Sequence, residues 1–145
     1  MLVLVCSLAF AQEAQLSPLA LPASVLAAIE GRHPGAVVVA AEQEQGEHEA
    51  QITVGERKLE LKFNAEGEWL EEEETVPVVA LPASIRATLA KRWKVWALVE
   101  AERAISATAT TYEVKLTRGK KGKEVVLSEQ GAVLEVEGRD EEEGD

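Results

Sequence analysis

The sequence reads LPASV at residues 21–25 and LPASI at residues 81–85, sixty positions later. Ile29 and Leu89 match at the same offset. Self-similarity at one spacing is the signature of a repeated structural unit. The sequence therefore predicts two copies of one unit along the chain.

The match continues at a slightly larger offset in the second half of each unit. HEAQI at residues 48–52 corresponds to YEVKL at residues 112–116, an offset of 64. The change of offset predicts a four-residue insertion between Glu102 and Tyr112. An insertion confined to one place is typical of a lengthened connection between two strands.

Each unit is predicted to begin with a helix. Apolar positions recur at i, i+4, i+7 and i+8, which places them on one helical face. These positions are Leu21, Val25, Ala28 and Ile29 in the first unit, and Leu81, Ile85, Thr88 and Leu89 in the second. Pro22 and Pro82 suit the first helical position, where a missing N–H costs nothing. HPG at residues 33–35 ends the first helix, whereas the end of the second is less clearly marked.

After each helix the period changes to two, which is typical of strands with one buried face. Alternating apolar residues are Ala50, Ile52, Val54, Leu59, Leu61, Phe63, Val114, Leu116, Val125 and Leu127. Glycines between the runs suit tight antiparallel turns. The predicted fold class is α+β: two tandem repeats, each one helix packed on a four-stranded antiparallel meander sheet, with the opposite face alternating to charge. The pattern leaves open how the two repeats pack together.

The two ends of the chain differ from this pattern. Residues 1–11, MLVLVCSLAFA, predict a signal peptide, with a buried first strand as the alternative. Cleavage there would remove Cys6, so the mature chain would have no thiol chemistry. The expected organisation is a signal peptide at 1–11, repeats at 12–76 and 77–138, and an acidic disordered tail at 139–145.

These motifs together resemble a known family. An LP-x-S-aliphatic helix is followed by Gly-Ala, then by Tyr-Glu-Val-x-Leu at residues 112–116, Gly-Lys-x-x-aliphatic at 122–126 and G-x-x-Leu-Glu at 131–135. Over roughly residues 16–138 the chain resembles the PepSY-like family of exported bacterial proteins, also described as β-lactamase-inhibitor-like. The resemblance implies a helix packed on an antiparallel sheet, secretion, and a role in binding or restraining other proteins, often peptidases or envelope enzymes.

The sequence departs from the family pattern at four places. Phe63-Asn64 and Leu127-Ser128 stand where the family commonly has Phe-Asp, and His33 replaces a tyrosine before Pro-Gly-Ala. The second copy lacks Pro-Gly altogether. Any family site that used these positions is therefore in doubt here.

The charge is distributed unevenly along the chain. The net charge is −11, yet residues 86–123 contain ten Lys or Arg and three Glu. One interpretation pairs this basic stretch with the acidic segments Glu71–Glu74 and Glu137–Asp145, in the same or another molecule, although exposed pairs contribute only ~0 to 1 kcal/mol each.

The other interpretation is a surface that faces a partner, because Trp and Arg are enriched at interface hot spots. Its candidate residues are Arg86, Arg92, Trp93, Lys94, Trp96, Lys115, Arg118, Lys120, Lys121 and Lys123. Phosphate would be repelled by an acidic protein, so a nucleic-acid partner is not expected.

The remaining aromatic and histidine residues indicate structural roles. Trp69 is expected to pack on the sheet, because Val133 is its counterpart. His33 and Trp93 are expected at equivalent helix ends, and neither His33 nor His48 is expected to bind a metal. The acidic runs Glu71–Glu74 and Glu141–Glu143 lack the loop pattern that arranges ligands around Ca²⁺.

The sequence lacks the motifs of catalysis, including G-x-S-x-G, H-E-x-x-H and the P-loop. We therefore predict a periplasmic or extracellular, non-enzymatic module without a cofactor, which binds a protein or peptide and inhibits an envelope or extracellular enzyme. The alternatives are a structural or Ca²⁺-sensing envelope protein that uses the acidic segments, and self-assembly of the acidic tail with the basic stretch of another copy. The pattern does not specify an oligomeric state.

Overall fold

The computed structural model describes residues 14–16 and 20–138. The predicted signal peptide and acidic tail lie outside these residues. In the described part, the strands form one antiparallel sheet in chain order, from β1 to β9. The elements are β1 (Ala14–Leu16), α1 (Ala23–Arg32), β2 (Val37–Glu44), β3 (Glu47–Val54), β4 (Arg57–Phe63), β5 (Trp69–Thr75), the 3-10 turn η2 (Val78–Ala80), α2 (Ala83–Arg92), β6 (Ala97–Ser106), β7 (Thr110–Arg118), β8 (Lys121–Ser128) and β9 (Val133–Gly138).

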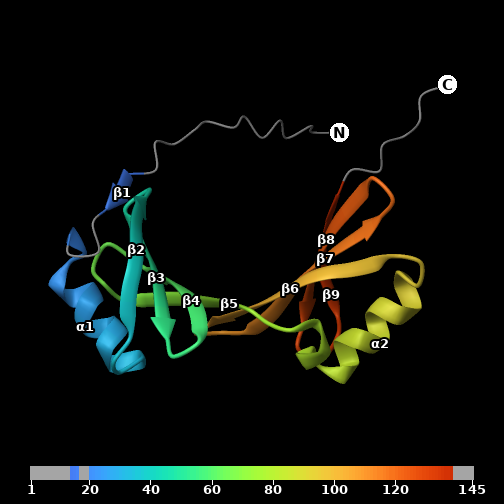
Figure 1. The fold of residues 1–145 in the computed structure, drawn as a ribbon, viewed down its shortest axis with the longest axis horizontal. Coiled ribbons are helices and arrows are strands. Elements are labelled where there is room, and N and C mark those ends of the chain that lie inside the picture. Colours follow the sequence, from blue (N-terminus) through green and yellow to red (C-terminus); the bar gives the residue numbers. More distant parts are fainter. Residues whose placement is uncertain (1–13, 17–19, 139–145) are drawn as a thin grey trace.

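The predicted fold class of two tandem helix-plus-four-strand repeats is wrong, because the sheet is continuous. Strands β5 and β6 pair directly, in a register that runs from Glu71 opposite Ser106 to Thr75 opposite Glu102. Figure 1 shows these two strands crossing the middle of the molecule between the parts that carry α1 and α2. The protein is thus mostly sheet, with the two helices as additions to it.

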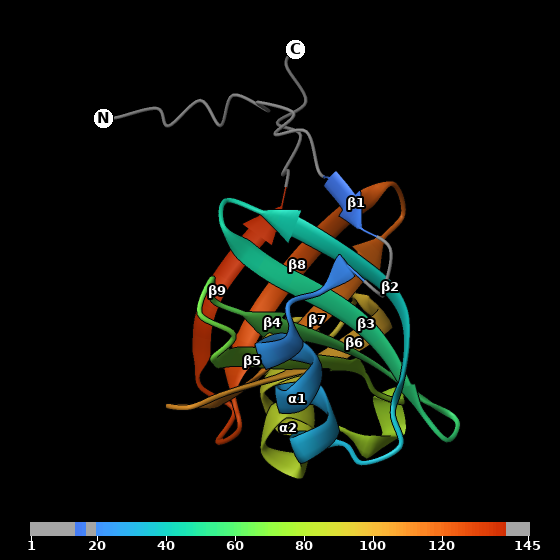
Figure 2. The same cartoon turned by 90° about the vertical axis from the view of Figure 1, so that its left-hand side faces the viewer.

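Both helices cover the same face of this sheet. Partners directly opposite each other in a sheet share a face, so the pairs Leu61 with Glu72 and Glu72 with Ile105 continue one face from β4 to β6. That face carries the buried residues under both helices. Figure 2 places α1 in front of strands β3 and β4.

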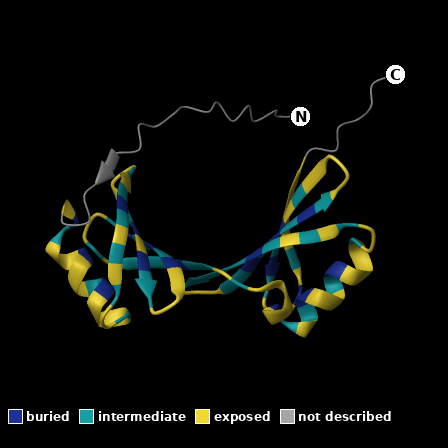
Figure 3. Ribbon diagram, viewed as in Figure 1, coloured by how far each residue is buried: buried dark blue, intermediate teal, exposed yellow. Residues whose placement is uncertain are grey.

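The helices bury their apolar stripes as the spacing predicts. Val25 and Ile29 of α1, and Ile85 and Leu89 of α2, are buried against the strands. Figure 3 shows buried positions concentrated where each helix meets the sheet, with intermediate burial along β5 and β6 between them. Burial on this scale stabilises by roughly 1.5–3 kcal/mol per large aliphatic side chain.

The two cores are separate clusters under the two helices. The first consists of Leu21, Val25, Ile29, Ala41, Ala50, Ile52, Leu59, Leu61 and Phe63. The second consists of Leu81, Ile85, Leu89, Ala101, Tyr112, Val114, Leu116, Val125 and Leu127. The two hydrophobic cores are therefore connected through the sheet and do not merge into one core.

The helix boundaries differ from the prediction by one residue. Pro22 and Pro82 are the residues immediately before the first helical residue, rather than the first helical residues themselves. Both helices end in the same way, because the His33 N–H donates to the Ile29 carbonyl and the Trp93 N–H donates to the Leu89 carbonyl. The second helix therefore ends cleanly without a Pro-Gly pair.

The predicted insertion lies in the β6–β7 hairpin. Strand β6 extends to Ser106 and β7 begins at Thr110, where the Ser106 N–H donates to the Ala109 carbonyl. No helix in the described part of the chain is both long and apolar enough to cross a membrane.

Candidate functional site

The face of the sheet opposite the helices, the helix-free face, is strongly acidic. Its residues follow from two observations: side chains alternate between the two faces along each strand, and residues paired across neighbouring strands share a face. Its glutamates are Glu42, Glu44, Glu47, Glu49, Glu60, Glu71, Glu73, Glu100, Glu102, Glu113, Glu124, Glu135 and Glu137. Among the described strands, the cationic residues that share this face are Lys58, Lys62 and Lys115.

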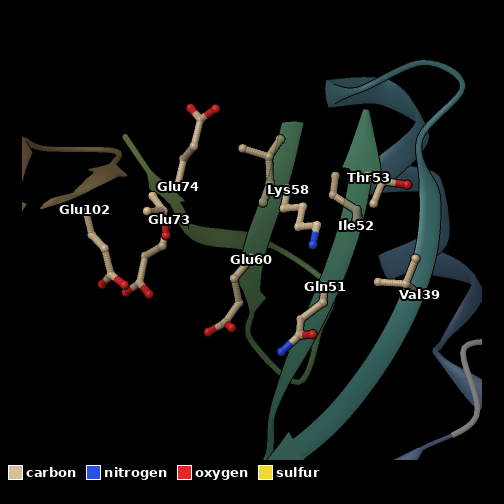
Figure 4. Close-up of a pocket in the computed structure, with 11 residues that line it drawn as sticks. Val39, Gln51, Ile52, Thr53, Lys58, Glu60, Glu73, Glu74 and Glu102 are labelled. Carbon is tan, nitrogen blue, oxygen red and sulfur yellow. The ribbon is translucent and has the colours of Figure 1, made fainter. Parts of the chain in front are cut away.

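A pocket of about 470 Å³ opens on this face where β3, β4, β5 and β6 run side by side. Its lining combines Val39 with the polar residues Gln51 and Thr53 and with several carboxylates. Figure 4 shows the carboxylates of Glu73 and Glu102 lying together, on the same side of the strands as Glu60. The carboxylate of Glu74, which follows Glu73, points to the other side.

A second hollow of about 190 Å³ adjoins the first on the β7 side. It shares Glu73 and Glu102 with the larger pocket and adds Glu71, Glu113 and Val126. Glu73 and Glu102 therefore stand at the centre of an acidic depression that crosses the β5–β6 pair.

Some carboxylates of this face, Glu60 and Glu113 among them, have raised pKa values. The pKa of Glu73 is lowered instead, because the effect of burial is outweighed by its hydrogen bonds with Glu71 and Lys62 and by the Lys62 charge. Partial burial, followed by the charge of Glu73, raises the pKa of Glu60. Burial, followed by the charges of Glu124 and Glu102, raises the pKa of Glu113. Like charges close together disfavour the ionised form, so this face would be stabilised by an added positive charge.

Two of the lysines on this face are already held by glutamates. Lys62 donates to Glu71 at 3.4 Å and to Glu73 at 3.1 Å. Burial lowers the pKa of Lys62, but the hydrogen bond that Lys62 donates to Glu73 and the charges of the surrounding carboxylates raise it overall. Lys115 donates to Glu100 at 2.6 Å. These contacts are examples of ammonium groups bound by glutamates of this face.

Replacing Glu60 with glutamine is expected to stabilise the protein at neutral pH by a few tenths to about 1 kcal/mol, because it removes a partly buried charge that Glu73 repels. The folded pKa of Glu60 is raised, so the wild-type penalty is present above that pKa and is lost as pH falls towards the ordinary value. Urea unfolding at pH 7 and pH 4 should therefore show a gain only at pH 7. A gain of equal size at both pH values would contradict this account.

The helix-covered face uses its polar residues structurally. His33 Nε2 lies 2.8 Å from the buried Glu72 carboxylate, and the Arg32 guanidinium stacks 3.6 Å from the centre of the Trp69 ring. Trp69 also packs against the first core, which confirms its predicted place. His48 is buried.

The residues predicted to face a partner do not form one surface. Lys115 lies on the helix-free face, and Arg86 lies alone in the first half of α2. The others gather near the end of α2, on its side of the sheet: Arg92, Trp93, Lys94, Trp96, Arg118, Lys121 and Lys123, with Lys120 in the adjoining turn. Of the basic stretch, Arg103 reaches Glu74 at 2.7 Å, so the pairing predicted with residues 71–74 holds at that contact.

The sequence predicted that the face opposite the helices is charged, but it did not predict that the charge is mostly acidic. The basic and acidic stretches of the sequence divide the charge along the chain, whereas the structure divides it between the two faces of each strand. The signal was present in the alternation itself, because glutamate repeatedly occupies the positions between buried residues, as at Glu49 and Glu60.

Residues 46–135 match the family model described as "Putative beta-lactamase-inhibitor-like, PepSY-like". The chain belongs to this family. The match is single and crosses the expected boundary between residues 76 and 77, so it does not confirm two tandem copies. No functionally curated protein matches the sequence.

Solved structures from Bacteroides share the fold. A BLIP-like protein from Bacteroides fragilis NCTC 9343 is 21% identical, with 86% of this chain and 91% of that chain covered and a TM-score of 0.72. A DUF2874 family protein from Bacteroides uniformis ATCC 8492 is 13% identical, with 81% and 89% covered and a TM-score of 0.76.

A third structure, described as a "putative periplasmic" protein from Bacteroides eggerthii DSM 20697, is 15% identical. It covers 81% of this chain and 88% of that chain, with a TM-score of 0.74. The predicted periplasmic or extracellular location agrees with this description.

Proposed function

We propose that this protein is a non-enzymatic binding module whose helix-free face receives a cationic segment of a protein or peptide partner. The observation that carries the proposal is the central depression, in which Glu73 and Glu102 lie together and are flanked by Glu60 and Glu113. An ammonium or guanidinium group placed there would relieve repulsion among the carboxylates and gain charge-assisted hydrogen bonds.

The shape of this face favours a segment of a macromolecule. The adjoining hollows of about 470 and 190 Å³ are open, and they continue across several strands. Val39 and Val126 add apolar contact beside the carboxylates, which suits a chain that alternates basic and apolar side chains.

The family description supports an inhibitory role. "BLIP-like" is said of the Bacteroides fragilis protein. For this chain we extend the proposal to an envelope or extracellular enzyme with a basic surface, which would be inhibited when that surface is covered. Electrostatic attraction of this kind mainly speeds association and selects the partner.

A basic peptide of alternating lysine and leucine tests the proposal. Calorimetric titration at low salt should show binding, and affinity should fall as salt is added because exposed charges are screened. Replacing Glu73 and Glu102 together with glutamine should weaken binding by about tenfold or more, since each lost charge pair is worth up to ~1 kcal/mol.

The matched control is Glu129→Gln, which removes a charge from the β8–β9 turn and leaves the depression intact. Its affinity should stay within about twofold of wild type. Equal losses in the double variant and the control would contradict the proposed site, and failure of the peptide to bind at low salt would contradict the proposed chemistry.

The described residues give little support to the alternative of a Ca²⁺-sensing protein. The run Glu71–Glu74 alternates between the two faces, so Glu72 and Glu74 lie on the opposite face from Glu71 and Glu73 and the four carboxylates do not converge on one point. Within residues 14–16 and 20–138, no three acidic, histidine or cysteine side chains are grouped to hold a metal ion. The run Glu141–Glu143 lies outside the described residues.

A further inference from the structure

A separate pocket, distinct from the two hollows of the helix-free face, lies on the helix-covered side at the end of α2. Its volume is about 300 Å³, and its lining is Leu89, Ala90, Trp93, Lys94, Trp96, Leu98 and Leu116. Two indole rings and several aliphatic side chains make it an apolar site, which we call the tryptophan pocket. Trp93 and Trp96 are half-buried and pack against the second core, so the pocket is built into the fold.

Cationic groups surround the tryptophan pocket. The Arg92 guanidinium lies 4.9 Å from the centre of the Trp93 ring, and the Lys123 ammonium lies 5.4 Å from the centre of the Trp96 ring. Lys94 lines the pocket itself. Arg118 and Lys121 occupy opposite positions on β7 and β8, on the same face as Lys123. They extend the positive charge along the hairpin.

The acidic residues of this half of the molecule face the other way. In strands β6 to β9 the described glutamates lie on the helix-free face, and α2 itself contains no acidic residue. The tryptophan pocket is therefore an apolar depression within a positive field, opposite in sign to the site of the proposed function and on the other side of the sheet.

We infer that the tryptophan pocket is a second recognition site, for an acidic protein segment that inserts one aromatic or aliphatic side chain between Trp93 and Trp96. The apolar lining accepts the side chain, and the exposed cations Lys94 and Lys121 pair with the flanking carboxylates. Half-buried indoles that line a depression favour insertion of a partner's side chain over insertion of the indoles into a lipid surface. This site does not depend on the helix-free face.

Indole N–H signals in ¹⁵N NMR spectra of the full chain test the inference directly. The probe is a short acidic peptide with a central phenylalanine. The signals of Trp93 and Trp96 should shift, whereas that of Trp69, which lies under α1, should not. The same peptide with alanine for phenylalanine, or with lysines for its acidic residues, should bind at least about tenfold more weakly.

Charge reversal separates the site from general electrostatics. Lys94→Glu combined with Lys121→Glu alters two exposed side chains and should weaken binding about tenfold or more, since two attractive contacts become repulsive. Arg86→Glu changes an exposed charge in the first half of the same helix and should have less than about a twofold effect.

Three results would overturn the inference. They are an acidic peptide that leaves both indole signals unmoved, equal losses in the Lys94→Glu/Lys121→Glu and Arg86→Glu variants, and indole signals that respond to phosphatidylglycerol vesicles but not to the peptide. The last result would reassign the surface to a membrane.

Discussion

Replacing Gly131 with alanine is expected to lower the free energy of unfolding by about 3 kcal/mol or more, the largest effect expected from a single substitution described for this protein. Gly131 has a φ of 84°, and an added Cβ would lie 2.6 Å from the Ser84 carbonyl oxygen in the first turn of α2. The Gly131 carbonyl also accepts a hydrogen bond from the Thr88 hydroxyl at 2.7 Å. The β8–β9 turn and α2 would have to move apart.

Gly46→Ala is the matched control, since Gly46 has a φ of 86° and open space where its Cβ would be. It carries the conformational strain without the clash, so a loss of about 1 kcal/mol is expected. Urea unfolding of both variants measures the difference. Equal losses would show that the close approach between the β8–β9 turn and α2 does not contribute to stability.

Replacing Glu74 with alanine is expected to cost about 2 kcal/mol at pH 7, because it leaves two arginines of a partly buried network without their shared partner. The Glu74 carboxylate accepts hydrogen bonds from Arg57 at 2.8 and 3.0 Å and from Arg103 at 2.7 Å. These contacts join β4 to β6 across β5. This part of the sheet lies between the two hydrophobic cores, and none of the described buried residues of either core belongs to β5.

The contribution of Glu74 should depend on pH. The Arg57 hydrogen bond and the nearby charges lower the pKa of Glu74, so its stabilisation is present above the ordinary pKa and is lost as pH falls through the folded value. Wild type and Glu74→Ala should therefore converge in stability in strong acid. Glu56→Ala, an exposed change in the β3–β4 turn, should have little effect at any pH. A Glu74→Ala loss that persists unchanged at low pH would contradict the ionic network.

The helices and the buried face were predictable because their residues carry a hydrophobic period. Val25 and Ile29 show the helical spacing, and Ile52 and Leu61 show the strand alternation. The continuity of the sheet was not predictable in the same way. Strand β5 contains four consecutive glutamates, so hydropathy says neither which face it buries nor which strand it pairs with.

The acidic depression was not predicted from the sequence, and the partner-binding role of the predicted basic and aromatic residues stays a prediction. The basic and aromatic residues of the second half do gather at the end of α2, although Lys115 and Arg86 stand apart from them. The acidic depression depends on Glu73 and Glu102, which are distant in sequence and meet only because β5 pairs with β6. Once the register of that pair is known, the separation of charge between the two faces follows from simple alternation.

The location of a bound basic peptide tests the central claim most directly. Backbone amide signals of the ¹⁵N-labelled chain, followed during titration with the lysine-leucine peptide, should change at the helix-free face, at positions such as Gln51, Thr53, Thr75 and Thr111. The backbone amide signals of α1 and α2 should not shift. Changes confined to the two helices, with the helix-free face undisturbed, would contradict the account.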